Sequence, residues 1–136
     1  MVLPMLMVFL FGILECGLLI KDAVGLNQAA REGARAAATG ATPTTIDLRV
    51  TTSAPTIDTS KMSKLYEYRS WDPDGYGQWT VLGADGGQNN ASERDQIRVT
   101  LQYPHQLVTG ALFASLADDT GGDTVTLSTA IITRRE

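Results

Sequence analysis

The chain opens with an apolar segment of twenty residues and then becomes polar without losing its helical character. Residues 1–20 read MVLPMLMVFLFGILECGLLI and contain one charged residue, Glu15. As an α-helix they would extend about 30 Å, which matches the hydrocarbon thickness of a bilayer. A cleaved secretory signal is the alternative, but the segment has neither a basic start nor a small-x-small site near Gly17. The pattern therefore predicts a retained membrane helix.

Residues 21–38, KDAVGLNQAAREGARAAA, continue this helix with strong helix formers. Small residues recur at every fourth position, and we assign them to helix packing and assembly: Gly25, Ala29, Gly33 and Ala37. A second stripe of alanines lies beside them. Such stripes let helices approach closely in an assembly, but the pattern is equally typical of an alanine-rich helix laid on its own sheet. Gly40 is expected to cap the helix, and Pro43 is expected to prevent its resumption.

Glu15 is the other candidate assembly residue. A carboxylate within an apolar helix is costly and is a functional candidate for that reason. It could pair with a basic group or a terminal amine of a neighbouring subunit. Alternatively, its side chain could reach the membrane interface near Lys21.

The rest of the chain alternates between apolar and polar positions, as half-buried strands do. Strands are predicted at residues 46–51, 64–71, 78–82, 94–103 and 124–133, with Pro104 ending the fourth. Residues 106–117 are expected to form a short helix or an irregular cover over the core. The predicted fold is α+β and pilin-like. It comprises a long apolar-to-amphipathic N-terminal helix (residues 1–40) and a small, mainly antiparallel β-rich head (residues 41–136).

Composition removes several classes of function. The net charge of −4 disfavours nucleic-acid binding, which needs a basic face. Cys16 is the only cysteine and His105 the only histidine, so an intrachain disulfide and a zinc site are both excluded. We expect a buried, inert Cys16 and a structural or solvent-facing His105. No nucleophile–base motif or phosphate loop is recognised, so no catalytic residue is assigned.

One loop has the beginning of an ion-binding pattern. Asp72 and Asp74 lie in the sequence DPDG, which starts like a calcium loop but lacks the later bidentate glutamate, because that position is Gly83. A plain hairpin turn is the preferred interpretation, with calcium as the alternative and no other cofactor expected. Aromatic residues surround this loop and favour cross-strand packing: Tyr66, Tyr68, Trp71, Tyr76 and Trp79.

Several stretches resemble the TadE-like family, pilin-like proteins of tight-adherence (type IVc) pilus systems. The stretches are VLP at residues 2–4, GILE at 12–15, NQAAREGAR at 27–35, IRVTL at 97–101, and the closing residues 127–136. The resemblance covers both ends, and AAREGARA is its most specific part. Members usually carry a basic leader, a peptidase-cut glycine and an early glutamate before the VLP. The sequence either begins at a late start or has Met1 as its mature end.

The resemblance implies a pilin-like structural subunit rather than an enzyme. Its partners would be copies of itself or other pilins in a helical filament, the inner-membrane assembly machinery and membrane lipid. The head would lie outside the cytoplasm and later on a cell-surface pilus. Lys21, Arg31 and Arg35 follow the apolar segment and alone favour the opposite orientation, but a leader would supply the missing cytoplasmic charge. The alternative function is a membrane-anchored adhesin or binding module that does not polymerise.

Overall fold

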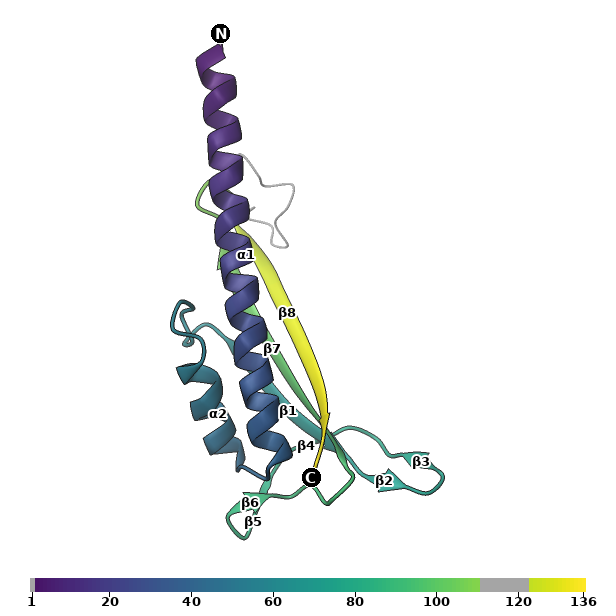
Figure 1. The fold of residues 1–136 in the computed structure, drawn as a ribbon. Coiled ribbons are helices and arrows are strands. Elements are labelled where there is room, and N and C mark those ends of the chain that lie inside the picture. The colour runs from purple at the N-terminus through teal and green to yellow at the C-terminus, as the bar shows by residue number, and fades with distance from the viewer. Residues whose placement is uncertain (1, 111–122) are drawn as a thin grey trace.

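A long helix projects from a small α+β head in the structure, a computed structural model that describes residues 2–110 and 123–136 (Figure 1). Helix α1 spans Val2–Ala38 and the short helix α2 spans Pro43–Thr52. An antiparallel sheet of four strands follows, in the spatial order β4-β1-β7-β8. The predicted fold class is confirmed.

Helix α1 ends as its sequence predicts. Gly40 has a φ of 89° and its N–H donates to the Ala37 carbonyl, while the Ala41 N–H donates to the Ala36 carbonyl. These two bonds form a Schellman-type cap, in which a glycine avoids the steric cost of a left-handed backbone.

The predicted strand at residues 46–51 is wrong, because these residues belong to α2. Thr42 caps the helix through its hydroxyl, which accepts a hydrogen bond from the Thr45 N–H at 3.3 Å. Pro43 begins α2 rather than preventing a helix, since its missing N–H is harmless in the first turn. Ile46 and Val50, four residues apart, are fully buried, whereas Leu48 between them is 64% exposed.

The sheet contains the other predicted strands. Strand β1 spans Ser63–Arg69, β4 spans Thr80–Val81, β7 spans Gln96–Gln106 and β8 spans Thr124–Arg134. Two small hairpins project from it, formed by β2 (Trp71–Asp72) with β3 (Gly75–Tyr76) and by β5 (Ala84–Asp85) with β6 (Gln88–Asn89). Of the predicted segment 106–117, Gln106 belongs to β7, and residues 111–117 lie outside the described residues.

Pro104 does not end its strand, contrary to expectation. It lies within β7 opposite Thr126 of β8, whereas the pairing of β7 with β1 stops at Gln102. Because β1 does not reach Pro104, that side of β7 needs no N–H there, and proline is tolerated. The inward face of β7 therefore continues beyond the buried Ile97, Val99 and Leu101 to His105.

Both helices pack on the same face of the sheet and enclose one core. Its largest fully buried side chains come from α1, α2 and β7: Leu26, Ile46, Val50, Ile97, Val99 and Leu101. The C-terminal half of α1 is thus part of the head's core. Its N-terminal half extends past the sheet, as Figure 1 shows.

Candidate membrane and assembly surface

The N-terminal half of α1 exposes an apolar surface. Its large apolar side chains from Val2 to Leu14 are between 39% and 78% exposed, and Ile20 is 63% exposed. By length and composition α1 can cross a membrane, and only 6% of its most apolar window is buried within the chain. A contiguous apolar surface of this size requires a cover of lipid or protein. We call residues 2–20 of α1 the apolar segment.

The head covers the stripe of small residues at Gly25, Ala29, Gly33 and Ala37. All four are buried, and the alanines of the second stripe are buried beside them. A Cβ atom on Gly33 would lie 2.6 Å from Val50 Cγ2 of α2, and one on Gly25 would lie 3.2 Å from Ile57 Cδ1. The helix laid on its own domain is therefore the arrangement seen here, and a contact of the stripe with another subunit stays a prediction.

Glu15 lies in the apolar segment but is only 3% exposed. Its Oε1 accepts a hydrogen bond from the Val108 N–H at 3.0 Å, and its Oε2 accepts one from the Thr109 N–H at 3.1 Å. The Thr109 hydroxyl donates a third, at 2.9 Å. Glu15 thus has partners within its own chain, in the segment that follows β7. We call residues 107–110 the tip. Its pairing with another subunit stays a prediction.

His105 lies between Glu15 and a second carboxylate of α1. Its Nδ1 is 2.7 Å from Asp22 Oδ2, and its Nε2 is 3.6 Å from Glu15 Oε1. With 5% exposure His105 is structural, so its solvent-facing interpretation is wrong. Sequence reasoning missed this contact because it ended the strand at Pro104, although the alternation of β7 places His105 on the inward face. We call Glu15, Asp22, His105, Val108 and Thr109 the Glu15 clasp.

Tyr103 precedes the clasp on the same face of β7. Burial raises the pKa of the Tyr103 hydroxyl, and the nearby Asp22 carboxylate raises it further. The Tyr103 hydroxyl is therefore partly desolvated and lies near the Asp22 carboxylate.

Asp72 and Asp74 lie in the exposed β2–β3 hairpin. The Asp74 N–H donates to Asp72 Oδ1 at 3.2 Å, which is the local bond of a tight turn. The predicted hairpin turn is present, since Asp72 pairs with Gly75. Across residues 2–110 and 123–136, no three histidine, cysteine or acidic side chains are placed to hold a metal. Calcium binding stays a prediction.

Arginine side chains pack against several of the aromatic residues beside this hairpin. The Arg69 guanidinium carbon is 4.7 Å from the ring centroids of both Tyr76 and Trp79, and that of Arg98 is 4.2 Å from Trp79. Cation–π contacts of this kind stabilise an exposed sheet face. The aromatic residues thus have packing partners of their own.

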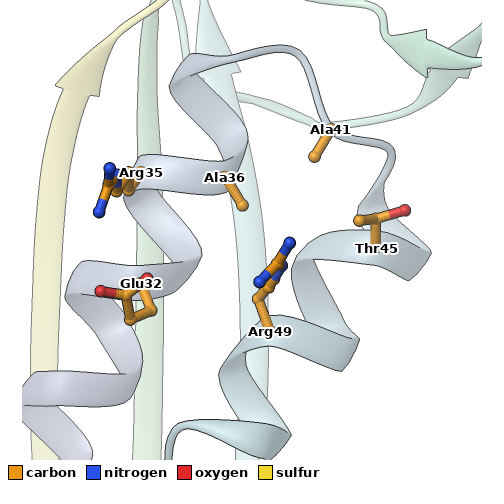
Figure 2. A pocket seen from close by; sticks show the side chains of 6 residues that line it. All are labelled: Glu32, Arg35, Ala36, Ala41, Thr45 and Arg49. Atoms are coloured by element: carbon orange, nitrogen blue, oxygen red, sulfur yellow. The ribbon is translucent and has the colours of Figure 1, made fainter.

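A shallow groove of about 370 Å³ runs between α1 and α2. Figure 2 shows its lining, which combines charged side chains with alanines: Glu32, Arg35, Ala36, Ala41, Thr45 and Arg49. With one carboxylate and no histidine or cysteine, this lining does not form a nucleophile–base pair. Glu32, Arg35 and Arg49 make no ion pair within the part of the chain that the structure describes.

Comparison with known proteins agrees with the N-terminal motifs. Residues 1–35 match the family model described as TadE-like protein, which confirms the resemblance over most of α1. No curated protein and no solved structure matches the chain. The match shows a likeness to TadE-like proteins over the N-terminal helix, and it does not extend to the head.

Proposed function

We propose that this protein is a pilin-like structural subunit of a tight-adherence (type IVc) pilus. The apolar segment holds it in the inner membrane before assembly and packs against neighbouring helices in the filament afterwards. The observation that carries the proposal is the exposure of that segment, which coincides with the residues that match the TadE-like family. A core helix of a soluble domain would bury this surface within its own chain.

The burial of the small-residue stripe refines which surface assembles. The faces of Gly25, Ala29, Gly33 and Ala37 are taken by the head, so a neighbouring helix reaches them only if the head rearranges. The apolar segment is free, and the exposed Arg31, Glu32 and Arg35 continue it on the outward side of α1. We therefore propose that assembly contacts use the apolar segment and these charges.

The same proposal defines location and partners. The head lies outside the cytoplasm and reaches the cell surface in the pilus. The partners are copies of this chain or other pilins, the inner-membrane assembly machinery and membrane lipid. We propose a structural role for the chain rather than catalysis. A non-polymerising adhesin remains the alternative, and it predicts that the chain stays in the membrane fraction.

Mass spectrometry of filaments sheared from cells tests the proposal. The chain should be present in the sheared fraction, and its N-terminal peptide would identify the mature end. Leu6→Asp, in the apolar segment, should abolish both membrane retention and incorporation into filaments, because a charge on a lipid-facing surface is costly. Leu48→Asp is the matched control, since Leu48 is 64% and Leu6 59% exposed. Wild-type chain confined to the membrane fraction would favour the adhesin.

A further inference from the structure

The head overlaps the C-terminal end of the apolar segment rather than beginning beyond it. Exposed apolar side chains follow one another along α1 as far as Ile20, Lys21 is the first basic residue, and one more exposed apolar side chain, Val24, lies beyond it. The tip that follows β7 is bonded to Glu15, six residues before Lys21. At a rise of roughly 1.5 Å per residue, the tip contacts α1 about 9 Å closer to the helix N-terminus than Lys21.

The tip itself has the composition of a surface that meets lipid. Its described residues are Leu107, Val108, Thr109 and Gly110, none of which is ionisable. Val108 is 72% exposed. A mainly apolar groove of about 370 Å³ lies beside this contact, where α1 and the tip meet, and its lining is Phe11, Ile13, Leu14, Glu15, Gly17, Leu18, Val108 and Thr109.

Three backbone N–H groups of the tip make hydrogen bonds within the chain, and that of Leu107 donates to the Asp123 carbonyl. The N–H groups of Val108 and Thr109 donate to Glu15. The Glu15 carboxylate is therefore buried and hydrogen-bonded. Non-helical backbone is tolerated at membrane depth only where its hydrogen bonds are made within the protein. The bonds to Glu15 meet this requirement for the N–H groups of Val108 and Thr109, whereas the buried His105 Nε2 makes no hydrogen bond among the described residues.

We propose that the tip at residues 107–110 is a second membrane-contacting element, which seats the head in the lipid interface of the unassembled subunit. This inference rests on the proposed membrane anchoring of α1. The occupant of the groove is then a lipid acyl chain, because the groove is continuous with the apolar segment. The alternative occupant, a side chain from a second copy, would exclude both lipid and water from Val108.

Site-directed spin labelling in vesicles of phosphatidylethanolamine and phosphatidylglycerol tests this. Four exposed valines provide matched labelling sites in a Cys16→Ser background: Val8 (48%), Val24 (51%), Val81 (67%) and Val108 (72%). Each is changed to cysteine, labelled with a nitroxide and checked for folding by circular dichroism. Collision with oxygen, which concentrates in lipid, is compared with collision with a water-soluble nickel chelate.

The label at Val108 should collide with oxygen several-fold more than with nickel, and it should lie deeper than the label at Val24. The label at Val81 should show the reverse preference. Nickel access at Val108 equal to that at Val81, with Val8 in lipid, would overturn the seating but leave the anchor intact. Protection of Val108 from both reagents would also overturn it, in favour of a second copy. Nickel access at Val8 would contradict the proposed anchoring itself.

Discussion

At the scale of single residues, the buried Glu15 carboxylate is surrounded by hydrogen-bond donors from its own chain. Burying an ionised group without partners is expensive, and the three donors at Val108 and Thr109 offset that cost. These partners lie 93 and 94 residues away in the sequence. The contact therefore ties the anchoring helix to the last hairpin of the head.

Glu15→Gln tests this tie. The amide keeps the size of the side chain but replaces one acceptor by a donor that faces N–H groups, so the tip should loosen. We expect the free energy that holds the tip against α1 to fall by about 1–3 kcal/mol. Hydrogen exchange of the Val108 and Thr109 amides, measured on the protein in lipid nanodiscs, should become correspondingly faster. Glu32→Gln is the control, because Glu32 is exposed, and unchanged exchange in Glu15→Gln would refute the role of the clasp.

Gly33 is a second residue with a specific requirement. A methyl group there would lie 2.6 Å from Val50 Cγ2, a buried atom of α2. Overpacking costs typically 1–3 kcal/mol and alanine returns roughly 1 kcal/mol of helix propensity, so Gly33→Ala should destabilise the head by about 1 kcal/mol. Thermal unfolding in nanodiscs measures this. Gly17→Ala, which meets nothing within 4 Å, should cause no loss. Equal stability of the two variants would contradict the close approach of α1 and α2.

At the scale of elements, sequence patterns predicted long or strongly periodic segments and failed at a short one. The apolar run and its helix formers identified α1, and alternation identified β1, β7 and β8. Residues 46–51 alternate too, but Ile46 and Val50 also fit a helical spacing of four, and six residues do not separate the two periods. The decisive signal was Thr42 followed by Pro43, a helix start that was interpreted as a stop.

Thr42→Ala tests the start of α2. Loss of the hydroxyl that accepts from the Thr45 N–H should cost about 1 kcal/mol, as for other threonine caps. Urea unfolding of the protein in nanodiscs, followed by circular dichroism, provides the measurement. Thr44→Ala, at an exposed position two residues after Thr42, is the control. If both variants unfold at the same urea concentration, the Thr42 cap contributes nothing to α2.

The candidate site was predictable in part for a physical reason. The apolar segment is local in sequence, so composition alone identified it. The Glu15 clasp is not local, because it joins α1 to the end of β7, and which partners a strand end reaches depends on the register of the whole sheet. Sequence reasoning therefore selected Glu15 as unusual but looked for its partner in another subunit.

At the scale of the whole molecule, two surfaces of α1 are available to a neighbouring subunit in the proposed assembly. One is the apolar segment, and the other is the charged outward side of α1 beside the groove in Figure 2. The head supplies the rest of its own packing through a single core. A subunit built this way can keep its fold in the membrane and use these two surfaces for assembly.

Arg35→Glu separates assembly from folding. Arg35 is exposed, lies in the last turn of α1 and has no ion pair among the described side chains, so reversing its charge should cost only the interaction with the helix dipole, about 1 kcal/mol, and leave the head folded. If its charge meets an acidic group of a neighbouring subunit, the amount of this chain in sheared filaments should fall several-fold while the membrane fraction keeps it. Quantitative mass spectrometry of both fractions measures this. Lys61→Glu, a reversal at an exposed loop position of the head, is the matched control. Equal incorporation of the two variants would show that the outward charges of α1 do not contact a neighbour, and assembly would then depend on the apolar segment alone.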